Sequence, residues 1–286
     1  MAMTAGGAAL ARATAIVATL VLLSGCGGLF GGGGPEDVPL DSFSAEQLYN
    51  RAEFLLDEDA PDEAATMFGE VERLYPYSEW AKRALVMQAY SYHLDRDFES
   101  ARGAAQRYLV TYPADEDAAW AQYLLALSYY DQIDDVGRDQ GLTFLALQEL
   151  RTVIETYPDS EYAQSAILKF DLAFDHLAAK EMEVGRYYLK RGNYIAAINR
   201  FRVVVENFQT TSQTPEALHR LVEAYLSLGL PAEAQTAGAI LGHNFQSTEW
   251  YQDSYALLTG RGLRPDATGD GWLAAVWRQT IRGEWL

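Results

Sequence analysis

Cysteine is almost absent from this sequence: Cys26 is the only one in 286 residues. A single cysteine excludes an internal disulfide and a zinc site built from cysteines. The four histidines, His93, His176, His219 and His243, are scattered, and no two share the spacing of metal ligands. The sequence also lacks a nucleophile elbow, a zinc-protease motif and a phosphate-binding glycine loop. We therefore predict no enzyme activity and no cofactor, and favour a binding function.

Basic residues are also scarce. The chain has 22 Lys and Arg against 40 Asp and Glu, which gives a formal net charge of -18. Such a chain is repelled by nucleic acid and by anionic lipid headgroups, so we expect no nucleic-acid partner. The negative charge either forms a solvated acidic surface or attracts a basic partner, and the sequence leaves both open.

The longest apolar run near the start, residues 13–23, is too short to span a bilayer of about 30 Å. It follows a weakly basic segment and precedes Leu23-Ser24-Gly25-Cys26. This order predicts a signal peptide over residues 1–25. Leu23-Ser24-Gly25-Cys26 matches the bacterial lipobox, which implies diacylation of the Cys26 thiol, cleavage before Cys26 and acylation of the new amino terminus. Gly27 follows the cysteine at the position where an Asp would indicate retention in the inner membrane, so the outer membrane is favoured. The alternative to a lipoprotein is an uncleaved signal anchor.

Residues 26–41 have the composition of a spacer. Residues 27–34 are rich in glycine, and residues 35–39 are acidic and bounded by prolines. Such segments behave as flexible chains. We predict a tether that holds the folded part away from the lipid surface.

From Ser44 onward, apolar residues recur at helical spacing. Tyr-Pro recurs at residues 75–76, 112–113 and 157–158, and Asn-Phe at residues 207–208 and 244–245. A stop that recurs after helical segments indicates a repeat, and the spacing resembles the 34-residue tetratricopeptide hairpin. The small positions expected where paired helices approach are Ala52, Ala89, Ala126 and Gly185, with Ala64, Ala101, Ala146, Ala197 and Ala234 on the second helices.

The fold class predicted is all-α: a tetratricopeptide-repeat solenoid of about five helical hairpins. Repeats 1–3 occupy residues 42–158, with about eight residues inserted around residues 131–141. Repeats 4–5 occupy residues 159–260. The apolar spacing of residues 160–191 is broken only by Glu181, which predicts one long helix. A helical bundle without repeats is the alternative.

Residues 261–286 form a linker and an amphipathic tail. Leu273, Val276, Trp277, Ile281 and Trp285 recur at helical spacing, beside Trp272. This helix covers the last exposed repeat face, binds a partner or lies at a membrane interface, and the sequence leaves the three open.

Several aromatic residues fall at positions that usually face the concave groove of such a solenoid: Tyr49, Tyr90, Trp120, Tyr123 and Tyr130. An aromatic groove suits an extended or amphipathic peptide with apolar anchors. The alternative is that these side chains only pack between repeats.

Three short sequence strings are more specific than the repeat spacing. They are residues 74–81 (LYPYSEWA), residues 137–140 (GRDQ) and the run from Tyr187 to Arg200 with Tyr-Tyr, Gly192, Tyr194 and Asn199-Arg200. With the lipobox and the five hairpins, they resemble the BamD family of the outer-membrane β-barrel assembly machinery. The resemblance covers about residues 44–258. The Trp-rich tail has no counterpart that we recognise in the family.

The resemblance implies a lipid-anchored scaffold on the periplasmic face of the outer membrane. It implies binding to the POTRA domain of BamA, to other lipoproteins of the complex and to C-terminal segments of unfolded outer-membrane proteins. The resemblance implies that Tyr75 corresponds to a tyrosine linked to substrate recognition in the family. It also implies that Asn199 and Arg200 correspond to the family's contact with BamA. A salt bridge within the array is the alternative for Arg200. Another periplasmic scaffold of envelope or division machinery, or an envelope hydrolase, is the alternative for the whole chain.

Overall fold

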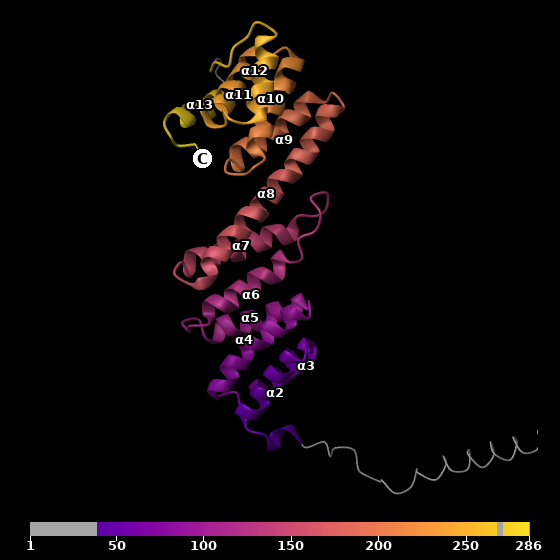
Figure 1. Ribbon diagram of the computed structural model, residues 1–286, viewed down its shortest axis with the longest axis vertical. Coiled ribbons are helices and arrows are strands. Elements are labelled where there is room, and N and C mark those ends of the chain that lie inside the picture. The colour runs from indigo at the N-terminus through magenta and orange to yellow at the C-terminus, as the bar shows by residue number, and fades with distance from the viewer. Residues whose placement is uncertain (1–38, 268–270, 286) are drawn as a thin grey trace, which may run out of the picture. The chain divides into compact units, whose positions relative to one another are not determined.

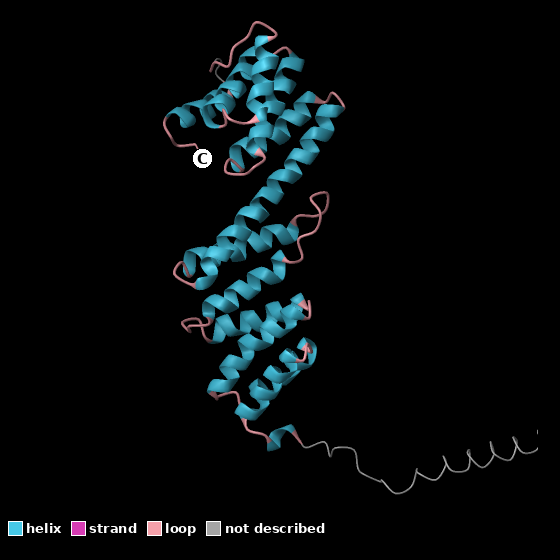
Figure 2. Ribbon diagram, viewed as in Figure 1, coloured by secondary structure: helices cyan, strands magenta, loops and turns pink. Residues whose placement is uncertain are grey.

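The computed structural model describes residues 39–267 and 271–285. The chain divides into two units, residues 1–44 and Ala45–Leu286, which are described separately. Of the first unit, the described part holds a short 3-10 helix, η1 (Leu40–Ser42). The predictions for the signal peptide, Cys26 and most of the tether lie outside the described residues. All regular secondary structure in the described residues is helical (Figure 2).

The second unit consists of consecutive antiparallel hairpins, in which each helix packs against the next (Figure 1). The hairpins are α2–α3, α4–α5, α6–α7, α8–α9 and α10–α11, so the predicted all-α solenoid of five hairpins is confirmed. Among the described helices, none is both long and apolar enough to cross a membrane. The bounds are α2 Ala45–Asp57, α3 Pro61–Leu74, α4 Glu79–Leu94, α5 Phe98–Thr111, α6 Ala118–Tyr130, α7 Gly141–Thr156, α8 Glu161–Lys190, α9 Tyr194–Asn207, α10 Thr214–Leu228, α11 Pro231–Asn244, α12 Glu249–Thr259 and α13 Trp272–Ile281.

The small residues expected between paired helices are buried. Ala52, Ala89 and Ala126 have no exposed surface. Gly185 faces the ring of Phe201, and a Cβ at this position would lie 2.4 Å from the nearest ring carbon. This is well inside van der Waals contact, so the approach of α8 to α9 requires glycine here.

Helix α8 is continuous over thirty residues and passes through Glu181 without a break. It packs against α7 and also against α9. It ends in a Schellman motif, because Gly192 takes a φ of +73° and its N–H donates to the carbonyl of Leu189 at 3.0 Å, while the N–H of Asn193 donates to Tyr188 at 3.0 Å. The long helix predicted for this region is therefore present, and Gly192 allows the chain to reverse into α9.

Helix α12 was not anticipated as a separate element. It begins after Thr248, whose hydroxyl accepts a hydrogen bond from the N–H of Tyr251 at 3.3 Å. The run Thr248-Glu249-Trp250 resembles the start of α4, where Ser78 caps the helix before Glu79 and Trp80. This hydroxyl–Glu–aromatic signal was available in the sequence.

The tail packs on the fifth hairpin. Leu273, Val276 and Trp285 are buried in the same core cluster as α10 and α11. The expectation that Trp285 continues the tail helix is wrong, because α13 ends at Ile281 and the chain turns at Gly283, with a φ of +71°. The turn directs Trp285 back toward Phe245, at 6.0 Å between ring centroids. This packing favours the capping role among the three that the sequence left open.

A polar contact at Asp115 fixes the turn between α5 and α6, which leads from the second hairpin to the third, onto the second hairpin. Its carboxylate accepts hydrogen bonds from the Lys82 ammonium at 2.6 Å and the Tyr108 hydroxyl at 2.6 Å. Burial acts to raise the pKa of Asp115, but the hydrogen bonds from Lys82 and Tyr108 outweigh it and hold the pKa below its usual range. The ionised carboxylate is therefore the form that stabilises this junction.

We expect Asp115→Asn to lower the free energy of unfolding at pH 7 by about 1–2 kcal/mol, since it removes charge-assisted hydrogen bonds. A lowered pKa stabilises the fold at pH values above the ordinary aspartate pKa of about 4, and that contribution is lost as the pH falls through the folded-state value. Urea denaturation at pH 7 and near pH 3 measures both effects. The difference in the free energy of unfolding between Asp115→Asn and the parent should be smaller near pH 3 than at pH 7. The exposed Asp253→Asn serves as control, and an equal effect there would contradict the assignment.

Candidate partner-binding surfaces

Two of the aromatic residues assigned to the groove lie in contacts between successive repeats. Tyr49 packs on Trp80 at 5.0 Å between centroids, and Tyr123 stacks on Tyr162 at 5.4 Å. Tyr49 is 7% exposed and Tyr123 is 9% exposed, and the Tyr123 hydroxyl is 2.6 Å from the hydroxyl of Ser165. Burial and proximity to Glu53 raise the pKa of Tyr49 to about 12. For these two residues the structure favours packing between repeats.

The other three aromatic residues are partly exposed. Tyr90 and Trp120 lie 5.7 Å apart between centroids on α4 and α6. Tyr130 at the end of α6 carries the Lys169 ammonium over its ring at 4.9 Å. These three keep surface that a partner could contact, although each also bridges neighbouring helices.

Tyr75 closes α3. Its N–H donates to the carbonyl of Val71 at 3.0 Å, and its carbonyl accepts from the hydroxyl of Ser78 at 2.9 Å. The ring is half-buried, whereas the neighbouring Tyr77 is fully exposed. Tyr77 was quoted in the family string but was not singled out, and it adds an accessible aromatic surface beside Tyr75.

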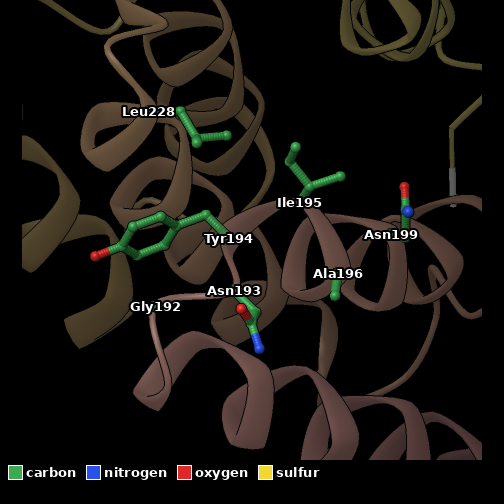
Figure 3. Close-up of a pocket in the computed structure, with 7 residues that line it drawn as sticks. All are labelled: Gly192, Asn193, Tyr194, Ile195, Ala196, Asn199 and Leu228. Carbon is green, nitrogen blue, oxygen red and sulfur yellow. The ribbon is translucent and has the colours of Figure 1, made fainter.

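Asn199 lies at the edge of a hollow of about 480 Å³ between the start of α9 and the end of α10 (Figure 3). Ile195 and Leu228 project from these two helices toward the hollow (Figure 3), and Ile195 is 69% exposed. An exposed isoleucine in a mainly apolar hollow is typical of a protein contact. The lining residues are Gly192, Asn193, Tyr194, Ile195, Ala196, Asn199 and Leu228.

Arg200 lines a second hollow, which shares Ala196 and Asn199 with the first. Its guanidinium Nη1 lies 3.0 Å from the Glu181 carboxylate on α8. The alternative of a salt bridge within the array is therefore present in the structure. The Arg200 side chain is still 45% exposed, so the pair is screened by water and Arg200 keeps donors for a second carboxylate.

Glu181 is the residue that interrupts the apolar spacing of α8, and the sequence did not reveal why. The adjacent Lys180 donates to the carbonyl of Gly137 at 2.8 Å, in the inserted loop. One turn of α8 therefore contacts both the Gly-Arg-Asp-Gln string and Arg200, which are far apart in the sequence.

A serine, a histidine and a carboxylate meet between α10 and α12. His219 Nδ1 is 2.9 Å from the Ser254 hydroxyl, and its Nε2 is 3.7 Å from the Glu223 carboxylate. Ser254 has no exposed surface and His219 is 4% exposed, so a substrate cannot reach them. Among the described residues, no group of three or more His, Cys, Asp or Glu could hold a metal ion. The arrangement joins two helices and does not support the hydrolase alternative.

Comparisons with known proteins identify the family of this chain. The sequence model of the family described as an outer membrane lipoprotein (YfiO) matches residues 41–240. The outer membrane protein assembly factor BamD of Caulobacter vibrioides is 44% identical over 254 residues, which are 89% of this chain and 83% of that protein. This chain belongs to the BamD family. The BamD of Rickettsia prowazekii is also 44% identical, over 74% of this chain and 84% of that protein.

The family model ends before the tail, within the fifth hairpin. The family match ends at residue 240, within α11, so α12 and α13 lie beyond it. A BamD of Neisseria meningitidis is 30% identical over 71% of this chain and 80% of that protein. Among solved structures, the pilus biogenesis factor PilW is 14% identical and covers 73% of this chain and 96% of its own, with a TM-score of 0.34.

Proposed function

We propose that this chain is a non-enzymatic scaffold that binds BamA and unfolded outer-membrane proteins during β-barrel insertion. The observation that carries the proposal is the exposed surface around Asn199 and Arg200, which lies within the family match and combines an apolar hollow with an accessible guanidinium. A planar guanidinium can bind a carboxylate through two parallel hydrogen bonds, and an exposed Ile195 can anchor the contact.

Repeats 1–3, residues 42–158, form the substrate-linked half in this proposal. The accessible aromatic residues there are Tyr75, Tyr77, Tyr90, Trp120 and Tyr130. Aromatic side chains lose few rotamers on binding, and they suit the apolar residues of an unfolded barrel segment. The buried aromatic pairs that join the repeats hold this surface in position.

Lipidation of Cys26 anchors the scaffold at the periplasmic face of the outer membrane in this proposal, and residues 26–41 act as its tether. Several acyl chains give stable attachment where one chain gives marginal binding. Confinement to the membrane raises the effective concentration of the scaffold near a membrane-embedded partner. Other lipoproteins of the complex are further partners.

Arg200→Glu tests the proposal. We expect binding to a purified BamA POTRA domain to weaken by about 100-fold, because the new carboxylate repels an acidic partner group and leaves the neighbouring Glu181 unpaired. Surface plasmon resonance on the lipidated chain measures the affinity. Arg107→Glu is the matched control. Arg107 lies on α5 in the second repeat, is 52% exposed and pairs with Glu72 on α3 in the first repeat.

Glu181→Gln separates a partner contact from an internal salt bridge. If Arg200 binds the partner, removing the Glu181 charge leaves the affinity unchanged or higher. If the pair only supports the array, Arg200→Glu and Glu181→Gln alter the thermal melt together and neither changes the affinity. That second result would overturn the placement of the BamA contact.

A further inference from the structure

Two hollows of about 380 and 450 Å³ meet where α7 begins, α9 ends and α8 passes its midpoint. They share Phe144, Leu177, Asn207 and Phe208, so they form one continuous groove, here called the α7–α9 cleft. The inserted loop forms one rim. The cleft exists because α8 is long enough to pair with α7 along one part and with α9 along another.

The cleft has an apolar floor. Leu177 and Leu147 are buried in it, and the rings of Phe174 and Phe208 lie 4.8 Å apart between centroids. Phe144 on the α7 side is 60% exposed. An exposed phenylalanine beside an apolar hollow leaves water in contact with a large ring, and a partner side chain seated there would displace that water.

Two side-chain amides line the cleft beside its apolar floor. Gln148 on α7 and Asn207 on α9 are exposed and line the cleft. A side-chain amide both donates and accepts hydrogen bonds, so it can bind the backbone of an extended peptide. A helical peptide has already paired most of these backbone groups within itself, and the amides therefore favour an extended occupant.

The rim carries positive charge, although the chain as a whole has a net charge of -18. Lys180 is bound to a backbone carbonyl, and Arg151 lies over the ring of Phe170 at 5.4 Å. Within the part of the chain that the structure describes, neither cation has a carboxylate within 4.0 Å. Of the two acidic residues at the cleft, Asp139 and Glu181, the latter is paired with Arg200.

We propose that the α7–α9 cleft binds an extended acidic segment of another polypeptide. One large apolar side chain of that segment packs between Phe144 and Phe208, and its carboxylates lie beside Arg151 and Lys180. Unpaired cations next to an apolar floor are complementary to an acidic peptide and repel a basic one. The cleft borders the Arg200 surface through Val203 and Glu181, but its proposed occupant is a different one from the BamA POTRA domain.

Fluorescence anisotropy tests the cleft, with the full lipidated chain in detergent micelles. The probe is a fluorescein-labelled peptide, Ser-Asp-Phe-Asp-Leu-Asp-Ser, and the matched probe carries Lys in place of each Asp. The acidic probe should bind at least about tenfold more tightly than the basic one. Arg151→Glu and Lys180→Glu should each weaken the acidic probe by about tenfold, and Phe144→Ser should weaken it further.

Matched variants outside the cleft control the measurement. Val110→Ser changes an 82% exposed apolar residue on α5, and Arg107→Glu reverses an exposed arginine. Both should leave the binding of the acidic probe unchanged. Equal binding of the acidic and basic probes, or unchanged binding in Arg151→Glu with an unchanged thermal melt, would overturn the proposal.

Discussion

Deletion of residues 271–286 should lower the free energy of unfolding by about 5 kcal/mol. The deletion removes the buried side chains of Leu273, Val276 and Trp285, and a buried side chain of this size contributes about 1.5–3 kcal/mol. It also removes the hydrogen bond from Trp272 Nε1 to the Tyr225 hydroxyl at 3.0 Å. A solenoid needs a cap because its terminal hairpin otherwise exposes an apolar face to water. Chemical denaturation of the deleted and full chains measures the loss.

Single substitutions in the tail distinguish capping from the other two roles. Trp285→Ala should cost about 3 kcal/mol because it empties a packed position beside Phe245. Ile281→Ser is the control, since Ile281 is 59% exposed and its loss should change stability by less than about 0.5 kcal/mol. A deleted chain that melts like the parent but loses a partner or membrane affinity would show that the tail is not a cap.

Gly185→Ala should lower the free energy of unfolding by about 2–3 kcal/mol. The added methyl would lie 2.4–2.8 Å from three ring carbons of Phe201, so α8 and α9 would have to move apart. Phe201 has no exposed surface and cannot swing into solvent without opening the hairpin. Thermal and urea denaturation measure the effect.

The same substitution at Gly103 is the matched control. Gly103 lies within α5, and a Cβ there has no neighbour within 4 Å in the described chain apart from the adjacent residues and backbone of its own helix. Gly103→Ala should therefore stabilise the protein by about 0.5–1 kcal/mol, because alanine loses less backbone entropy in a helix. Phe201→Leu combined with Gly185→Ala should recover part of the loss. Similar effects at both glycines would show that packing against Phe201 is not the cause.

The hairpins could be predicted from sequence because each carries its own local signals. Helical spacing, a small residue at the close approach and a recurring stop repeat five times, so no long-range information is needed. Trp285 shows where that reasoning ends. Its spacing fits α13, but Gly283 closes the helix with a left-handed turn, and Trp285 packs on Phe245, which follows the end of α11.

The binding surfaces were harder to predict, since exposure depends on neighbours from other repeats. Tyr49 and Tyr123 occupy positions that usually face a groove, but the first turns of α4 and α8 supply Trp80 and Tyr162, which cover them. The role of Glu181 also required the fold, because its partner Arg200 lies on the next helix. A single sequence shows which side chains share one face of a helix, but it does not show which residues of other repeats pack on that face.

Helix α8 is a continuous helix of about 45 Å that packs against α7 of the third hairpin and pairs with α9 in the fourth. In an ordinary repeat array a hairpin can fray while its neighbours persist, because each unit owns both of its helices. Here α8 belongs to the fourth hairpin and also forms the surface on which α7 of the third hairpin packs, so melting of the fourth hairpin exposes the third. Rotation of one end of this helix must also carry the other end with it, so a load applied at the first three repeats reaches the last two without passing through a flexible joint.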